Sequence, residues 1–146
     1  MNNLNPIQIK IVTLNVRGLN KSIKRRSIFR WLHMQNPHFY FSQETYSEEK
    51  LKDVWEAEWG EKTFCSHGTK HSKSVMILLN PKYDIEVEKL ERDTHGRLII
   101  LNTKLNDTNL VLINLYAPKD LSQQVQFFER ITDKLKLRGR KHYNRW

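Results

Sequence analysis

Asn15, Glu44 and Tyr116 stand at the ends of three apolar stretches of the sequence, and their side chains suit the handling of a phosphate. A carboxylate and a side-chain amide brought together are suitable ligands for Mg²⁺, a hard ion that takes oxygen ligands and keeps several waters. A nearby tyrosine could donate a hydrogen bond to a phosphate oxygen. Each residue alone also has an ordinary explanation, because asparagine is common in turns and glutamate is common in the first turn of a helix.

The surrounding patterns place these three residues at the ends of strands. Residues 7–14 alternate apolar and polar side chains and are rich in β-branched types, which predicts a strand just before the asparagine. Residues 38–42 predict a second strand before the glutamate, and residues 109–115 predict a later strand before the tyrosine. Ligands in layered α/β folds gather outside strand ends, so a shared site is expected there.

The remaining patterns complete a layered domain. They predict helices at 20–35, 47–58 and 121–137, and further strands at 63–66, 75–79, 85–90 and 97–105. The first helix should end at Asn36, because the residue before a proline is pushed out of the α region. Residues 106–108 are typical of a hairpin connection. The order of elements indicates an α+β or α/β layered domain.

The composition fits one intracellular domain. The chain has 146 residues, 38% of them hydrophobic, which is enough for one domain with a core. The lone Cys65 excludes a disulfide scaffold and a cysteine-based zinc site. No stretch approaches the ~20 apolar residues of a membrane span, and the start lacks the apolar block of a signal peptide. We therefore expect an intracellular protein with no membrane partner and no small-molecule cofactor.

Basic residues are concentrated near the two ends of the chain. The formal net charge is +9, from 25 Lys plus Arg against 16 Asp plus Glu. Two acid-free clusters hold much of this excess: Arg17, Lys21, Lys24, Arg25, Arg26 and Arg30, and then Lys134, Lys136, Arg138, Arg140, Lys141 and Arg145. Such clusters bind phosphate backbones by releasing counterions, although a solvated surface explains a basic cluster about equally well.

Five short motifs, taken in order, resemble the endonuclease domain of LINE-type (non-LTR) retrotransposons. They are TLNVRGL at 13–19, SQET at 42–45, SHG at 66–68 leading into VMIL at 75–78, DTHGR at 93–97 and NLYAP at 114–118. These domains belong to the endonuclease/exonuclease/phosphatase superfamily, which includes DNase I and the apurinic endonucleases. The resemblance runs from about Ile9 to Leu135, nearly the whole chain.

The resemblance implies a fold, an activity and partners. The fold would be an α+β, DNase I-like four-layer α/β/β/α sandwich, here truncated before its last strands. Residues 7–137 would be the N-terminal portion of the domain, and residues 138–146 would be a basic tail. The family reaction is Mg²⁺-dependent hydrolysis of a phosphodiester, which in LINE elements nicks target DNA. DNA would be the partner, a reverse transcriptase module would follow in the parent protein, and the location would be nuclear.

The resemblance also assigns roles to individual residues. Asn15 would help to organise the metal and the phosphate, Glu44 would be the metal ligand, and Tyr116 would contact the scissile phosphate. The expected DNA contacts are Arg17, Arg25, Arg26, Ser66, Lys70, Lys73 and Arg97.

The sequence departs from the family pattern in four places. A Gly-Asp-Phe-Asn segment, whose Asp and Asn position the attacking water, is missing, and so is a Ser-Asp-His segment that contacts the scissile phosphate. Ser74 stands where the family usually has glycine, and Lys119 stands where an asparagine commonly follows Tyr-Ala-Pro. Positioning of the base or nucleophile contributes about 10²–10⁴-fold in rate, so we expect no useful nuclease activity from this chain alone.

Two alternatives to a truncated endonuclease remain open. One is a non-catalytic nucleic-acid-binding fragment that uses the basic residues between Arg17 and Arg30 and the basic tail. The other is a poorly folded relic of a mobile element, or an incomplete gene product. DNA binding that survives loss of Glu44 would favour the first, and absence of cooperative unfolding would favour the second.

Overall fold

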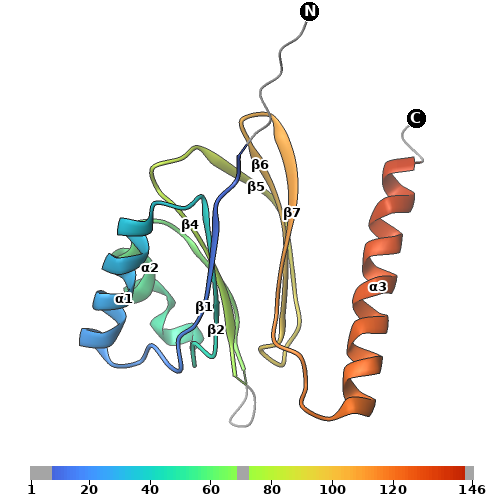
Figure 1. The fold of residues 1–146 in the computed structure, drawn as a ribbon, viewed down its shortest axis with the longest axis horizontal. Helices are drawn as coiled ribbons and strands as arrows, with labels where there is room; N and C mark the ends of the chain where they lie inside the picture. Colours follow the sequence, from blue (N-terminus) through green and yellow to red (C-terminus); the bar gives the residue numbers. More distant parts are fainter. Residues whose placement is uncertain (1–7, 69–72, 144–146) are drawn as a thin grey trace, which may run out of the picture. The chain divides into compact units, whose positions relative to one another are not determined.

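The computed structural model describes residues 8–68 and 73–143, with side chains described as far as residue 137. It divides into two units, residues 1–116 and residues 117–146. The first unit contains all of the strands that the structure describes. It is drawn in blue to orange in Figure 1.

The first sheet has four strands in the order β1-β2-β4-β3. Strands β1 (Ile11–Asn15) and β2 (Phe39–Gln43) run parallel, which requires the crossover that helix α1 (Ser22–Gln35) supplies. Strands β4 (Val75–Leu79) and β3 (Thr63–Ser66) continue the sheet in antiparallel pairs. The parallel pairing brings the ends of β1 and β2 to one edge of the sheet, as the sequence predicts.

The second sheet is an antiparallel meander of three strands. They are β5 (Ile85–Arg92), β6 (Leu98–Leu105) and β7 (Thr108–Leu115), in that order. The turn between β6 and β7 has positive φ at Asn106 (48°) and Asp107 (66°). Two such residues are typical of a type I′ hairpin turn, whose twist matches that of the flanking strands.

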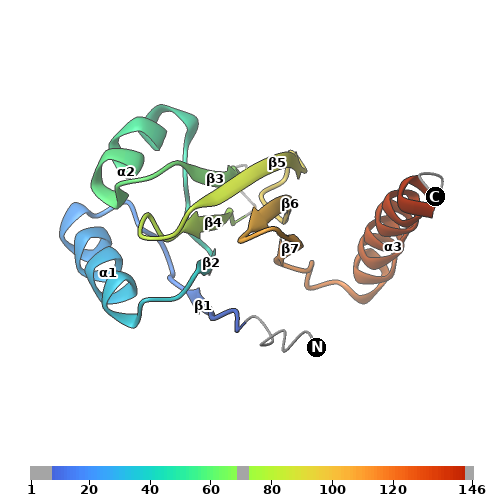
Figure 2. The same ribbon diagram turned by 90° about the horizontal axis from the view of Figure 1, so that it is seen from above.

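The two sheets pack face to face around an apolar core. Strand β4 is buried along its whole length, so it faces packed side chains on both sides. Ile77 and Phe39 of the first sheet pack in one cluster with Ile99 and Leu101 of the second. Figure 2 shows this arrangement from above, with β5, β6 and β7 on one side of the first sheet and α1 and α2 on the other.

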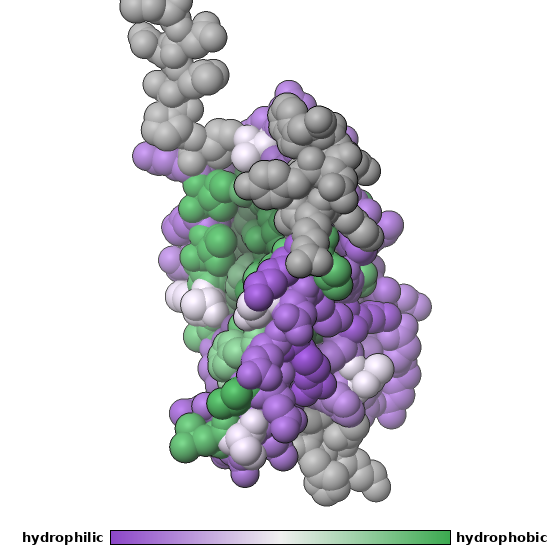
Figure 3. All heavy atoms as spheres, turned by 90° about the vertical axis from the view of Figure 1, so that its right-hand side faces the viewer, coloured by the Kyte–Doolittle hydropathy of each residue, from purple (hydrophilic) through white to green (hydrophobic). Residues whose placement is uncertain are grey.

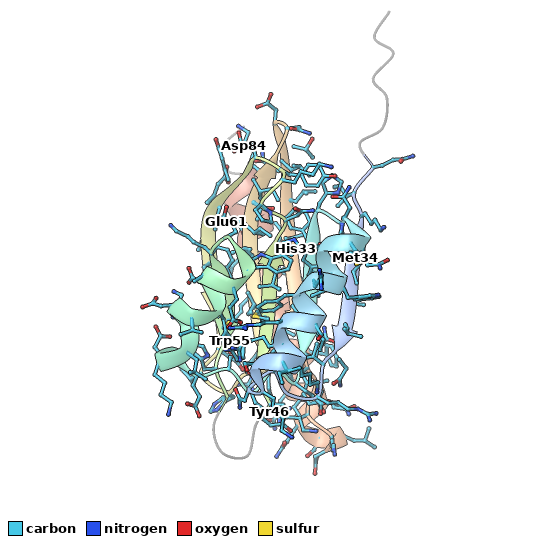
Figure 4. The ribbon with its side chains drawn as sticks, turned by 90° about the vertical axis from the view of Figure 1, so that its left-hand side faces the viewer. His33, Met34, Tyr46, Trp55, Glu61 and Asp84 are labelled. Carbon is cyan, nitrogen blue, oxygen red and sulfur yellow. The ribbon has the colours of Figure 1, made fainter. Side chains whose placement is uncertain are left out.

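Helix α1, the 3₁₀ turn η1 (Glu49–Leu51) and helix α2 (Lys52–Trp59) cover the outer face of the first sheet. Trp55 and Trp59 are buried there with Tyr40 and Leu32. The indole N–H of Trp59 donates to the carbonyl of Leu79 at 2.8 Å. Figure 4 looks onto this helical face, with Trp55 between the helices. Helix α1 ends at Gln35, and Asn36 before the proline has left the right-handed helical region, with φ 50°.

The second unit contains helix α3 (Leu121–Tyr143). Asp120 caps its start, because its Oδ1 accepts hydrogen bonds from the backbone N–H groups of Ser122 and Gln123. Hydrophilic side chains dominate the face of this helix in Figure 3. The helix continues beyond Leu137 into the segment expected to be a tail, because Lys and Arg are good helix formers. No helix in the described part of the chain is long and apolar enough to cross a membrane.

Candidate metal and phosphate site

The candidate site is built on a strained loop at the end of β2. Glu44 and Tyr46 have positive φ (56° and 54°), and so does Arg17 (50°) after β1. A left-handed backbone costs a non-glycine residue roughly 1–2 kcal/mol, and such strain collects at functional sites. The two loops hold each other in place, because the N–H of Gly18 donates to the carbonyl of Glu44 at 2.6 Å.

Three residues predicted from the strand ends come together here. The Tyr116 hydroxyl, just after β7, donates to Oε1 of Glu44 at 3.4 Å. The Asn15 side chain, at the end of β1, also lies close enough to Glu44 to lower the pKa of its carboxyl. Its Oδ1 accepts the backbone N–H of Arg17 at 3.2 Å, which fixes the turn after β1. The three strand ends therefore converge on one carboxylate.

Lys73 is the strongest partner of that carboxylate. Its ammonium donates to Oε1 of Glu44, and it lies 5.9 Å from the centre of the Tyr116 ring. The Glu44 side chain is 8% exposed and the Lys73 side chain 34% exposed. The sequence marked Lys73 as a DNA contact but gave no signal that it would pair with a residue 29 positions away.

The surroundings keep Glu44 ionised. The Lys73 ammonium lowers the pKa of the Glu44 carboxyl more than burial raises it, and hydrogen bonds from Asn15 and Tyr116 lower it further. The same pairing raises the pKa of Lys73. Near neutral pH the site therefore contains a largely buried, negatively charged carboxylate beside a positively charged amine.

Ser74 anchors the loop that carries Glu44. Its hydroxyl hydrogen-bonds to the hydroxyl of Thr45 and accepts the backbone N–H of Ser47 at 2.7 Å. The hydroxyl of Ser47 bonds in turn to Nδ1 of His67 at 2.8 Å. Ser74 is 1% exposed. The serine that stands in place of the usual glycine therefore supplies a hydroxyl that glycine lacks, and this hydroxyl stabilises the loop.

A buried amide network joins the two sheets beside the site. Asn114 of β7 donates to the carbonyls of Ser42 and Met76 at 3.1 and 2.8 Å. Its Oδ1 accepts from the side chain of Gln43 at 3.0 Å, and Gln43 also donates to Thr13 at 3.1 Å. Because Tyr116 lies two residues after Asn114, this network fixes the tyrosine relative to the end of β2.

Arg97 and Ser66 lie next to the site in supporting positions. The backbone N–H of Tyr116 donates to the carbonyl of Arg97 at 2.8 Å, and the Arg97 guanidinium donates back to the Tyr116 carbonyl at 3.3 Å. The Ser66 hydroxyl is buried and donates to Oδ1 of Asp93 at 2.6 Å. Ser66 therefore has a structural partner, which argues against the expected contact with DNA.

Arg25 needs the clearest correction among the expected DNA contacts. It is 5% exposed, its Nη2 donates to Glu58 at 2.8 Å, and its Nη1 donates to the Leu19 carbonyl at 3.0 Å. A buried guanidinium with these partners joins α1 to α2 and does not face a ligand. The neighbouring Arg26 has a 72% exposed side chain, and Arg17 is also exposed. The expected contact Lys70 lies outside the described residues.

The donor set suits a hard ion that binds through few protein ligands. Among the described residues no group of three or more His, Cys, Asp or Glu side chains could hold a metal. Mg²⁺ does not require such a cage, because it is often held by one or two carboxylates together with waters and substrate phosphates. The Glu44 carboxylate, with the Asn15 amide beside it, fits that pattern.

Two facing sheets, helices on the outer face of one, and polar residues at the converging strand ends define a DNase I-like fold. Solved structures agree. Truncated TDP2 of Caenorhabditis elegans matches with a TM-score of 0.63 and 19% identity over 88% of this chain. AP endonuclease LMAP of Leishmania major matches with a TM-score of 0.55 and 16% identity over 75% of it. The expected α+β, DNase I-like fold is thereby confirmed.

A sequence relative agrees with the resemblance drawn from the motifs. The "Transposon TX1 uncharacterized 149 kDa protein" of Xenopus laevis is 27% identical over 124 residues, or 85% of this chain. The chain spans 10% of that protein, 55% of the truncated TDP2 and 40% of LMAP. No protein-family model matches it. The chain thus resembles part of a LINE-type endonuclease domain.

Proposed function

We propose that this chain is the N-terminal part of a DNA-cleaving phosphodiesterase domain of the LINE type, with Mg²⁺ held at Glu44. The convergence of Asn15, Glu44 and Tyr116 from three strand ends carries the proposal. The strained backbone at Glu44 and its lowered pKa add support, because strain and shifted pKa values both collect at functional sites.

Each residue has a defined task in this proposal. Glu44 supplies the negative charge that binds the ion, and Asn15 fixes the orientation of the carboxylate. The Tyr116 hydroxyl, which donates a hydrogen bond to Glu44 in the metal-free protein, would donate it to a phosphate oxygen instead. A bound divalent ion would polarise the phosphoryl oxygen and offset the charge that develops on it. The amide network at Asn114 keeps these groups preorganised, which is where such catalysis gains most.

DNA is the proposed partner. The exposed Arg17 and Arg26 could neutralise backbone phosphates, and the net charge of +9 favours a polyanion. One structural neighbour, TDP2 of D. rerio (TM-score 0.60), was solved in complex with a single-strand DNA product. The likeness to a transposon protein supports a nuclear location and an accompanying reverse transcriptase in a longer protein.

We further propose that these 146 residues do not cleave DNA alone. They contain neither the Gly-Asp-Phe-Asn nor the Ser-Asp-His segment that supplies the water-positioning and phosphate-binding groups in the family. Groups that act as a unit lose most of their effect together. This stretch should therefore bind metal and DNA without measurable turnover.

Nicking of supercoiled plasmid with Mg²⁺ tests this proposal, using the chain and its Glu44→Ala variant after circular dichroism has shown both to be folded. We expect that neither protein nicks the plasmid. Nicking that requires both Mg²⁺ and Glu44 would show that the residues present suffice for hydrolysis, and would overturn the claim of inactivity.

A non-catalytic DNA-binding function is the second candidate, favoured by the exposed basic residues of α1 and the preceding loop. It predicts salt-sensitive binding that is unchanged in Glu44→Ala and weakened when Arg17 and Arg26 are replaced. If Glu44→Ala also removes the stimulation of DNA binding by Mg²⁺, the metal site is part of the function. If Mg²⁺ has no effect on binding by either protein, the non-catalytic function is the better account.

A further inference from the structure

We propose that Lys73 is a built-in counter-cation that holds the Glu44 carboxylate in the metal-free protein and has to leave that carboxylate before a divalent ion can bind it. This inference rests on the proposed metal site and adds a control of its occupancy. It concerns the affinity of the site for metal, and not the hydrolysis itself.

The position of the ammonium carries the proposal. Lys73 donates to Oε1 of Glu44, the same oxygen that receives the Tyr116 hydroxyl. It also lies 5.9 Å from the centre of the Tyr116 ring. The amine therefore supplies the compensating charge and a hydrogen bond to the carboxylate, next to the tyrosine proposed to contact phosphate. A metal ion and this ammonium would compete for the same negative charge.

The backbone of Lys73 is fixed while its side chain can move. A Cβ added to Gly96 would lie 2.8 Å from the Lys73 carbonyl oxygen and 2.6 Å from Cα of Gly68. The turn at Gly96 thus holds the two ends of the β3–β4 connection closely. The hydrogen bond from the N–H of Thr45 to the carbonyl of Ser74 at 3.1 Å fixes the next residue. The lysine stem is flexible, and its side chain is 34% exposed.

Charge balance explains why such a residue is useful. A carboxylate that is 8% exposed is costly to leave without a partner. In the metal-free protein the lysine supplies the compensating charge, and a divalent ion would supply it in the loaded protein. The exposed flank of the lysine gives the displaced ammonium access to solvent or to a DNA phosphate. The lysine would therefore weaken metal binding in the absence of DNA.

Binding of Mn²⁺ without DNA tests the inference, measured by electron paramagnetic resonance of the free ion at fixed ionic strength. The proteins are the native chain, Lys73→Met, Lys73→Arg, Glu44→Gln and the Glu44→Gln/Lys73→Met double variant. Lys73→Met keeps the stem and removes the charge, and Lys73→Arg keeps the charge. We expect Lys73→Met to bind Mn²⁺ at least about tenfold more tightly than the native chain, which equals about 1.4 kcal/mol.

The controls separate the two proposals. Lys73→Arg should bind like the native chain, and both proteins that carry Glu44→Gln should lose the site. If Glu44→Gln abolishes binding while Lys73→Met binds no more tightly than the native chain, Lys73 does not compete and this inference fails, while the metal site stands. If no protein shows Mn²⁺ binding that depends on Glu44, the proposed metal site fails and the competition fails with it.

Thermal unfolding in EDTA tests the counter-ion role by a readout that needs no metal. Lys73→Met should unfold at a lower temperature than the native chain, because it leaves Glu44 without its partner. The double variant should recover part of that loss, since the uncompensated carboxylate is gone. Equal losses from Lys73→Met in the presence and absence of Glu44 would overturn the counter-ion role.

Discussion

Glu44 combines three properties, two of which, backbone strain and a shifted pKa, collect at functional sites. Its backbone is left-handed, its side chain is 8% exposed, and its pKa is lowered by a lysine and by two hydrogen-bond donors. Burial and strain both cost stability, so the ion pair with Lys73 offsets part of that cost. The residue is therefore a sensitive point for both pH and mutation.

The lowered pKa predicts how the contribution of Glu44 to stability depends on pH. Because the folded value lies below the ordinary value of 4.5, this contribution is complete above that value and disappears as pH falls through the lowered one. We expect the difference in free energy of unfolding between the native chain and Glu44→Gln to be larger at pH 7 than at pH 3. Urea unfolding at both values measures it, and a difference independent of pH would contradict the assigned cause.

For individual residues, the sequence indicated which side chains belong to the candidate site better than it indicated which side chains they contact. Asn15, Glu44 and Tyr116 could be found because each follows a recognisable strand and matches a motif. The pairing of Lys73 with Glu44, and the burial of Arg25, depend on which segments come together in three dimensions. No local pattern contains that information, so basic residues of equal appearance in the sequence have different roles.

The elements that position the site meet at a few close contacts between loops. Gly96, in the turn between β5 and β6, has φ 72° and lies against the backbone of Gly68 and Lys73. Gly60, which ends α2, has φ 98° but has Pro81 Cγ at 3.8 Å as its near neighbour. The two glycines share a backbone requirement and differ in the space around them.

This contrast gives a matched pair of substitutions. Gly60→Ala should cost roughly 1–2 kcal/mol, from the left-handed backbone alone. Gly96→Ala should cost clearly more, because its Cβ would also meet backbone atoms at 2.6–2.8 Å. Urea denaturation of both variants measures the difference. Equal losses would mean that the turn does not press against the β3–β4 connection.

Helices α1 and α2 are joined by the Arg25–Glu58 pair, while Arg26 lies on the surface beside it. Arg25→Met should lower the free energy of unfolding by roughly 1–3 kcal/mol, because it removes two short hydrogen bonds from the largely buried Glu58 carboxylate and leaves only the ion pair with Arg26 at 3.7 Å. Arg26→Met, with its 72% exposed side chain, should change stability by less than about 0.5 kcal/mol.

DNA binding should respond in the opposite order. Arg26→Met should weaken binding and reduce the slope of log K against log salt by about one, whereas folded Arg25→Met should keep the native slope. Fluorescence anisotropy with a labelled duplex at several salt concentrations gives both numbers. A lowered slope in Arg25→Met with a native slope in Arg26→Met would contradict the assignment of DNA contact to Arg26 and of a structural role to Arg25.

Most elements were predictable from local patterns, and their neighbours were not. Alternation predicted β1, general strand character predicted the other strands, the residue before Pro37 marked the end of α1, and residues 106–108 marked the hairpin. The order β1-β2-β4-β3, with the later strand β4 in the middle of the sheet, could come only from the family resemblance, because it depends on long-range pairing. The extension of α3 to Tyr143 was missed because basic residues without apolar periodicity resemble a tail.

At the scale of the whole molecule, the core is well packed, whereas the candidate site contains only part of the residue set that the family resemblance implies. Residues 8–68 and 73–116 form two packed sheets and a helical layer, so a cooperative fold is expected of them. Among the described residues, the outer strands β1, β3, β5 and β7 each have one neighbouring strand, and the chain spans about half the length of the TDP2 structures that it matches. On the proposed function, these residues would supply the groups for metal and DNA binding and only part of those for hydrolysis.

Anomalous scattering from a crystal grown with Mn²⁺ tests whether Glu44 binds a divalent ion in place of Lys73, because it locates the ion and the lysine in one map. We expect an anomalous peak at coordination distance from the Glu44 carboxylate, with the Lys73 ammonium displaced from it. An intact Lys73–Glu44 pair at saturating Mn²⁺, with no peak beside Glu44 or with a peak elsewhere, would contradict it.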